Sequence, residues 1–305
     1  MMDIVGFWPF AKKESSWQSG KNAVGLEIGE DMRQSEAYAQ YMKCIGWEVE
    51  KIPGTRCQIF VRRLGVLGAV AKLQRTRLPL PWTVIDKILR KNRVILMRVE
   101  PLNCNFSAEE FEKAGYKSER EPLRATKTIR INLNKNPQEL LFSFKRARSW
   151  INKLVKNKHK VEIGNFDKFF EVWKKATRIQ NIWSSSKKDF DNLWGSFGEN
   201  AFSITIDDIC GCLILMHDKV AYYYYGAALP AAKGQNLPYL TIWEAMREAR
   251  KRGAKVWDWE GVYDPRFPNP KWKGFTQFKN TFGGEEVWFP GSFGKMTLRN
   301  LFPTT

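Results

Sequence analysis

The stretch of sequence over residues 222–261 reads YYYYGAALPAAKGQNLPYLTIWEAMREARKRGAKVWDWEG, and the order of its elements decides the fold. Tyrosines up to Tyr225 close an expected strand, and Asn236 then caps a helix that ends at Gly253. A further strand over 256–259 and a short helix over 274–282 follow. The stretch therefore predicts a strand, a loop, a helix, a strand and a helix, in that order.

Upstream of this stretch, alternating apolar residues predict a meander of three antiparallel strands. The strands are expected over 201–206, 211–216 and 220–225, and helices over 165–177 and 187–195 precede them. Helices that pack on a mostly antiparallel sheet are typical of an α+β fold.

The first half of the chain has a similar order of elements, although the two halves share no exact sequence repeat. Helices are expected over 34–46 and 82–91. Strands are expected over 47–52, 58–63, 69–73, 94–99 and 126–133. A helix rich in Lys and Arg, from residue 137 to about residue 157, connects the halves. The sequence thus predicts two similar α+β units in tandem.

Short motifs in the second half are shared with one known family. They are Asn236 with Pro238, the turn over 258–261, Phe278-Lys279, and Phe282-Gly283-Gly284. With these motifs the chain resembles the Fem-type (FemABX) aminoacyltransferases.

The first half and the connector carry further motifs that are similar to those of this family. They are Gln34-Ser35 with Tyr38, Lys43 and Gly46-Trp47, then Arg98-Val99-Glu100-Pro101, and Arg148 with Ile151 in an Arg-x-x-Ile pattern. Ser149-Trp150 stands where the family has Tyr-Asn, which is a departure from its pattern. The long helical hairpin that some members insert between the halves is not expected here.

The resemblance implies an α+β fold with two GNAT-like (acyl-CoA N-acyltransferase-like) domains in tandem. These are expected over 1–136 and 161–305, with a connector helix within 137–160. It also implies the family's activity, in which an amino acid moves from aminoacyl-tRNA to the stem-peptide amine of a peptidoglycan precursor. The implied partners are aminoacyl-tRNA and a UDP-linked or lipid-linked muropeptide, and no cofactor is implied.

The charge of the chain favours polyanionic partners. Its 50 Lys and Arg residues against 32 Asp and Glu residues give a formal charge of +18, which is more than solubility requires and fits tRNA or an anionic membrane surface. No apolar run approaches the roughly 20 residues that span a bilayer, and the apolar residues near the N-terminus follow no basic region. We therefore expect no signal peptide and a cytoplasmic protein, with peripheral contact to the inner face of the membrane as a further expectation.

The cysteine and histidine content argues against a disulfide framework and against a metal site. The five cysteines include no Cys-x-x-Cys pair, and Cys210 and Cys212 are expected as buried side chains on one face of a strand. His159 and His217 lack the neighbours of a catalytic triad or a metal site. A reduced compartment and no bound metal are expected.

The resemblance makes Lys279 and Phe278 the candidate catalytic residues, because the family's Phe-Lys motif lies near the acceptor end of the tRNA. A lysine there can offset phosphate or oxyanion charge. The sequence by itself favours a solvated lysine on an amphipathic helix. For Phe278, packing in the core is at least as common as stacking on a terminal base.

Four residues are candidates for substrate binding. Lys43 and Arg148 are candidates for binding the diphosphate or carboxylates of the muropeptide, and the alternative for both is a solvated side chain on a helix surface. Glu100 can orient the incoming amine or simply pair with Arg98. Tyr225 is expected to share a strand face with Tyr223, so that one face of the strand lines a cleft.

Two alternatives from other functional classes are open. An acyl-CoA N-acyltransferase would share the fold, but its pyrophosphate loop needs paired glycines. The segments RRLGVL at 62–67 and AAKGQN at 231–236 do not supply them. A noncatalytic RNA-binding protein fits the charge, but no recognised RNA-binding motif accompanies it.

Overall fold

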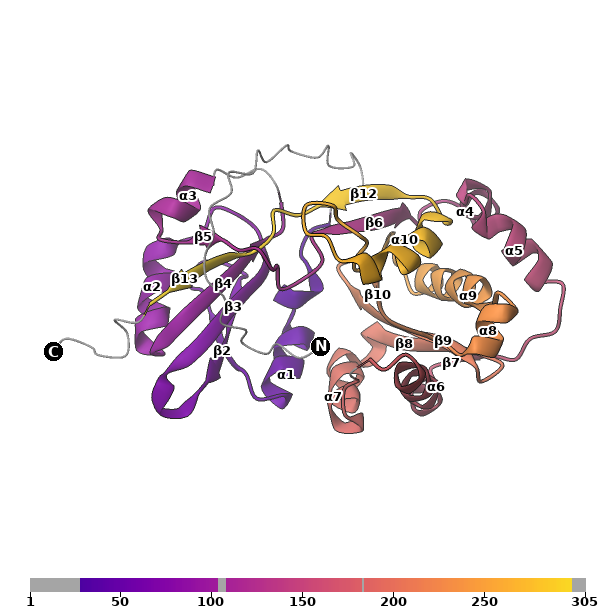
Figure 1. Cartoon of the computed structure of the whole chain (residues 1–305), viewed down its shortest axis with the longest axis horizontal. Coiled ribbons are helices and arrows are strands. Elements are labelled where there is room, and N and C mark those ends of the chain that lie inside the picture. Colours follow the sequence, from indigo (N-terminus) through magenta and orange to yellow (C-terminus); the bar gives the residue numbers. More distant parts are fainter. Residues whose placement is uncertain (1–27, 104–107, 183, 298–305) are drawn as a thin grey trace.

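The computed structural model describes residues 28–103, 108–182 and 184–297, and within them the chain forms two lobes, each built on a mixed sheet (Figure 1). The apolar N-terminal residues and Cys104 lie outside the described residues. Among the described residues, no helix is long and apolar enough to cross a membrane.

The first lobe contains a sheet of order β1-β2-β3-β4-β13-β5. Its strands are β1 (Glu48–Lys51), β2 (Gln58–Arg63), β3 (Ala69–Thr76), β4 (Val94–Pro101), β5 (Lys117–Ser118) and β13 (Phe293–Met296). The meander β1 to β3 is antiparallel, whereas β3 and β4 are parallel because helix α2 (Trp82–Lys91) connects them. The other helices of this lobe are η1 (Met32–Gln34), α1 (Glu36–Cys44), η2 (Gly65–Leu67) and α3 (Ala108–Lys113).

The second lobe contains a sheet of order β12-β6-β11-β10-β9-β8-β7. Its strands are β6 (Lys127–Asn132), β7 (Val161–Ile163), β8 (Ala201–Ile206), β9 (Cys210–His217), β10 (Val220–Ala228), β11 (Val256–Asp258) and β12 (Glu285–Trp288). Its helices are α4 (Pro137–Ser143), α5 (Ala147–Leu154), α6 (Phe166–Ile179), α7 (Lys187–Phe197), η3 (Gly198–Asn200), α8 (Pro230–Gly234), α9 (Leu237–Lys251), η4 (Pro270–Trp272) and α10 (Lys273–Asn280). Helix α9 makes β11 parallel to β10, as α2 does for β4 and β3.

Alternation along the central strands of the second lobe directs side chains to two separate cores. Ile204 and Ile214 pack with α5 and α9 on one face of the sheet. Leu213 and Leu215 pack with α6, α7 and α1 on the other face. Cys210 and Cys212 are buried on the α9 face, as expected, and burial raises the pKa of the Cys210 thiol to about 12, so both are packing residues.

The two sheets exchange strands. Strand β6, from the first half of the chain, pairs with β11 and β12 in the second sheet. Strand β13, near the C-terminus, pairs with β4 and β5 in the first sheet. The yellow β13 among the purple strands of the first lobe makes this exchange visible (Figure 1). Two strands therefore cross the expected division of the chain, which ties the lobes together.

The connector differs from the expected continuous helix. The chain leaves the helical conformation at Phe144, whose backbone is extended, so that α4 and α5 are separate helices. The Phe144 ring is buried against Trp243 and Phe282, with centroids 6.0 and 5.3 Å away. Leu140 before the break and Ile151 after it pack in the same core as Phe144, so both helices bury one side on the lobe. No long helical hairpin lies between β6 and β7.

The expectation that Tyr223 and Tyr225 share a face of β10 is wrong. The pairing of β10 with β9 shifts register between these residues, which is a β-bulge. Tyr223 packs with Trp259 in the core under α9, whereas Tyr225 stacks on Trp173 of α6, with centroids 4.8 Å apart. One extra residue in the strand reverses the side on which Tyr225 lies.

Candidate active site

The candidate site lies where the parallel strands β10 and β11 separate. Their pairing ends at Tyr222 and Asp258. Beyond this point β10 has its bulge, whereas the chain after β11 stays hydrogen-bonded to β6, since the Trp259 N–H donates to the Ile129 carbonyl at 3.1 Å. The segment 259–261 therefore no longer pairs with β10, and its backbone carbonyls are available to side chains.

Lys279 reaches this segment from α10. Its Nζ donates to the carbonyl oxygens of Trp259 at 2.9 Å and Gly261 at 2.7 Å, and the residue is only 8% exposed. The alternative of a solvated surface lysine is therefore wrong. An ammonium group has three N–H donors, and the two carbonyls take up two of them.

Aromatic rings surround the amine of Lys279. Its Nζ lies 4.7 Å from the centre of the Phe275 ring, 5.6 Å from that of Tyr223 and 5.7 Å from that of Trp259. Burial lowers the pKa of Lys279 to about 7, while the negative charges of Glu260 and Asp258 oppose this shift. Near neutral pH the amine thus exchanges between a charged donor and a neutral base. Phe275 is partly exposed, so the amine lies close to the surface on that side.

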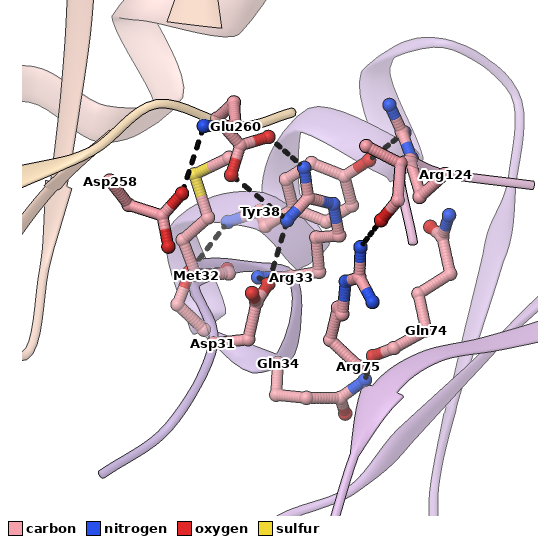
Figure 2. A network of polar contacts seen from close by, with 12 residues as sticks. Asp31, Met32, Arg33, Gln34, Tyr38, Gln74, Arg75, Arg124, Asp258 and Glu260 are labelled. Carbon is pink, nitrogen blue, oxygen red and sulfur yellow. Dashed lines mark hydrogen bonds and ion pairs between the residues drawn. The ribbon is translucent and has the colours of Figure 1, made fainter. Parts of the chain in front are cut away.

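Glu260 joins this segment to the first lobe (Figure 2). It adopts a left-handed backbone conformation with φ of 62°, and its carboxylate pairs with the guanidinium of Arg33, which also binds Asp31 at 2.9 Å. Burial opposes the charge of Arg33, but Glu260 and Asp31 raise its pKa well above the ordinary value. Since residues 259 and 261 hold Lys279 and residue 260 holds Arg33, one tripeptide connects the candidate site to η1.

Asp258 fixes the start of the same segment. Its carboxylate accepts hydrogen bonds from Arg130 Nε at 2.9 Å, Thr128 Oγ1 at 2.7 Å and the backbone N–H of Glu260 at 2.8 Å. Asp258 therefore pairs with Arg130 and Glu260 pairs with Arg33, and these ion pairs hold the segment in place. The segment 259–261 is thus anchored at both ends, and the buried amine of Lys279 lies behind it.

Phe278 lies next to Lys279 in α10, whereas Glu100 lies in β4 of the first lobe. Phe278 is half-buried and packs against Tyr239 and Phe282, with centroids 5.1 and 5.4 Å away. Glu100 is the penultimate residue of β4 in the first lobe and is 2% exposed. Its Oε1 accepts from Ser292 Oγ at 3.3 Å, and Oε2 has no hydrogen-bond partner among the described residues. Glu100 is thus buried with one free acceptor.

The remaining predicted residues do not gather around Lys279. Lys43 is exposed in the last turn of α1. Arg148 is exposed on α5, with its guanidinium 5.4 Å from the centre of the Phe142 ring. Tyr225 lies on the α6 side of β10, where its ring stacks on Trp173. Of the six candidates, only Phe278 and Lys279 are neighbours.

Arg33 is the residue of this site that the sequence did not single out. It is 227 positions from Glu260, and no local pattern links the two residues. Figure 2 shows Arg33 between Asp31 and Glu260, and it shows Arg75 and Arg124 close by, bound to the Ala125 carbonyl and the Tyr38 hydroxyl. A buried arginine beside two carboxylates becomes evident only once the lobes are assembled. In the described part of the chain, no group of three or more His, Cys, Asp or Glu residues could hold a metal ion.

The FemAB family model matches residues 205–303. This segment contains β10, β11 and α10, and with them Lys279 and Glu260. The match confirms the resemblance to the Fem family that the motifs predicted. A search of curated proteins finds no significant match.

Solved structures confirm the fold. The chain superimposes on FemX with a TM-score of 0.74 and 15% sequence identity, covering 89% of this chain and 94% of that one. It also matches the C-terminal domain of a putative lysylphosphatidylglycerol synthetase from Agrobacterium fabrum (TM-score 0.57, 10% identity, 88% and 90% of the chains) and L-PGS from Bacillus licheniformis (0.57, 9%, 89% and 88%). The predicted α+β fold of two GNAT-like domains in tandem is thereby confirmed.

Proposed function

We propose that this protein is an aminoacyltransferase that moves an amino acid from aminoacyl-tRNA to the stem-peptide amine of a peptidoglycan precursor. The observation that carries the proposal is the buried Lys279, which lies at the separated strands β10 and β11 inside the segment that matches the FemAB family model. The formal charge of +18 also suits a tRNA donor.

The reaction needs position and charge stabilisation more than a covalent nucleophile. The neutral acceptor amine attacks the ester carbonyl carbon, and a tetrahedral intermediate forms with its charge on the former carbonyl oxygen. The C–O bond to the tRNA ribose then breaks, the amide forms, and the proton lost by the amine ends on the ribose hydroxyl. A donor aimed at the oxyanion lowers this barrier.

Lys279 is suited to that task. Carbonyls of Trp259 and Gly261 fix two N–H groups of its ammonium, which leaves the third for the oxyanion or for a phosphate of the donor. The rings around Nζ exclude water and strengthen such an interaction. In the proposal Phe278 supports the terminal base of the donor with its open side while its other side packs on Tyr239.

We assign binding of the acceptor to the remaining candidate residues. Arg148 and Lys43 are exposed and able to bind the diphosphate or carboxylates of a UDP-linked or lipid-linked muropeptide. Glu100 is assigned to orienting the incoming amine, because its buried Oε2 has no hydrogen-bond partner among the described residues. For Tyr225 the stack on Trp173 favours a supporting role on the wall of the site.

Product mass tests this function. Purified protein is incubated with a pool of charged tRNAs and with soluble muropeptide, and the acceptor is analysed by mass spectrometry. We expect a mass increase of one or more amino-acid residues that requires charged tRNA. A product that forms with acyl-CoA and without tRNA would establish the acyl-CoA alternative instead. Tight binding of RNA without any product would favour the noncatalytic alternative.

A further inference from the structure

The segment 135–160, which contains α4 and α5, carries a concentration of positive charge at the end of the second lobe. Residues 135–160 contain eight basic residues and a single acidic residue, Glu139. All eight basic side chains are exposed: Lys135, Lys145, Arg146, Arg148, Lys153, Lys156, Lys158 and Lys160. Among the described residues only Lys160 of these forms an ion pair, with Glu162 and Asp208. The remaining cations are free to meet an external anion.

Apolar side chains are exposed among these cations. Phe142 at the end of α4 is 72% exposed, and Val155 at the end of α5 is 50% exposed. The Arg148 guanidinium lies beside the Phe142 ring, and Arg148 and Val155 are seven residues apart, which places them on the same flank of α5. The adjacent side of α5, with Ile151 and Leu154, packs on the core.

We propose that this basic face, defined as Phe142, Lys145, Arg146, Arg148, Val155 and Lys156, docks the protein on an anionic lipid bilayer. Clustered lysines and arginines on a helix attract an anionic surface, and apolar side chains between them enter the headgroup region. Phosphates of RNA would satisfy the cations, but they offer nothing to an exposed Val155. The combination of free cations and exposed apolar tips therefore favours a membrane over RNA.

The basic face is close to the candidate active site. The Ala147 N–H at the start of α5 donates to the Thr281 carbonyl just after α10, at 3.1 Å. Helix α5 is thus in direct contact with the end of the segment that carries Lys279. If the proposed function holds, docking through this face presents the site to an acceptor at the bilayer surface, which identifies the acceptor as the lipid-linked precursor.

Vesicle flotation tests the docking without using the transfer reaction. Wild-type protein is mixed with vesicles of phosphatidylcholine alone or with about one third phosphatidylglycerol. A variant with Lys145→Gln, Arg146→Gln and Lys156→Gln should bind anionic vesicles about 100-fold more weakly, since each surface cation contributes about fivefold. Phe142→Ser should lower binding about tenfold, because the ring no longer enters the bilayer.

Matched controls remove the same charge and a similar exposed apolar side chain from the other lobe. These are the variant with Lys87→Gln, Arg90→Gln and Lys113→Gln, all exposed on α2 and α3, and Leu67→Ser on η2. Both controls should bind vesicles like the wild type. All changes are at exposed positions, and circular dichroism confirms folding.

Three outcomes would overturn the docking proposal. The first is equal binding of the wild type to neutral and anionic vesicles, or equal losses in the basic-face and control variants. The second is a basic-face variant that loses tRNA binding and keeps vesicle binding, which would make the face an RNA surface. The third is a dimer in sedimentation that this variant disrupts while vesicle binding is unchanged. Transfer to a water-soluble UDP-linked acceptor is measured separately, so that a failed transfer reaction refutes the proposed function alone.

Discussion

The change Lys279→Met removes the amine at the centre of the candidate site and keeps most of the side-chain volume. The folded protein loses two hydrogen bonds from a charged donor, each contributing about 1.5–3 kcal/mol, but it no longer buries an ammonium group. Because these terms oppose each other, we expect the free energy of unfolding to change by less than about 3 kcal/mol. The rate of transfer should fall about 100-fold or more, as when an oxyanion donor is removed.

The assay is the single-turnover rate at saturating charged tRNA and acceptor, with urea denaturation of the same samples. Lys72→Met is the control, because Lys72 is also buried, 4.3 Å from the centre of the Trp47 ring in the first lobe, away from Lys279. It should keep the wild-type rate. A folded Lys279→Met protein with a rate within about threefold of the wild type would refute the reasoning.

The lowered pKa of Lys279 predicts how the stability and the transfer rate of the wild type and of Lys279→Met depend on pH. An unfolded lysine titrates near pH 10.4, whereas burial lowers the pKa of Lys279 to about 7 in the folded protein. Between these values the unfolded chain binds more protons, so the wild type gains stability as the pH rises through this window. Lys279→Met should lack this gain. If the ammonium form is the donor, the wild-type transfer rate should decrease above about pH 7, and the variant should show no such decrease.

Three further predictions concern the surroundings of the site. Arg33→Met should lower the free energy of unfolding by about 3–5 kcal/mol, because it leaves buried carboxylates unpaired. The double variant with Glu260→Gln should lose less free energy of unfolding than the sum of the two single variants. Strict additivity in urea denaturation would show that the pair is not coupled. Arg148→Gln should raise the KM for the acceptor about tenfold with unchanged thermal stability, since Arg148 is exposed; an unchanged KM would remove Arg148 from the acceptor site. Calorimetry should detect no micromolar binding of coenzyme A, and binding at that level would put the acyl-CoA alternative first.

Local patterns predicted most of the elements of the fold. Strand β8 and helix α2 have the bounds that alternation and the preceding proline indicated. The short strands β5, β7, β12 and β13 were not predicted, because two to four residues carry too little periodicity, whereas the equally short β11 was predicted from its place between a helix and a turn. The exchange of β6 and β13 depends on pairing between distant segments, and no local pattern encodes that pairing.

The candidate site was predictable only through its motif. Phe278-Lys279 identified the helix, but the sequence alone favoured a solvated lysine. Burial of Lys279 depends on carbonyls that become available where β10 and β11 separate. The bulge that moves Tyr225 to the opposite face and the pairing of Arg33 with Glu260 likewise arise from tertiary structure. The sequence therefore identified Phe278 and Lys279 as candidates, but it did not predict the tertiary contacts that surround them.

Transfer of a labelled amino acid in a single turnover tests the central claim most directly. Purified tRNA charged with one radiolabelled amino acid is mixed with excess protein and muropeptide, without ATP or coenzyme A, and the label on the acceptor is followed over time. With at least one of the charged tRNAs, the account predicts that label moves to the stem-peptide amine of the acceptor in the wild type and at least 100-fold more slowly in Lys279→Met. Label that remains on the tRNA, or that is released as free amino acid, with every charged tRNA tested would contradict it.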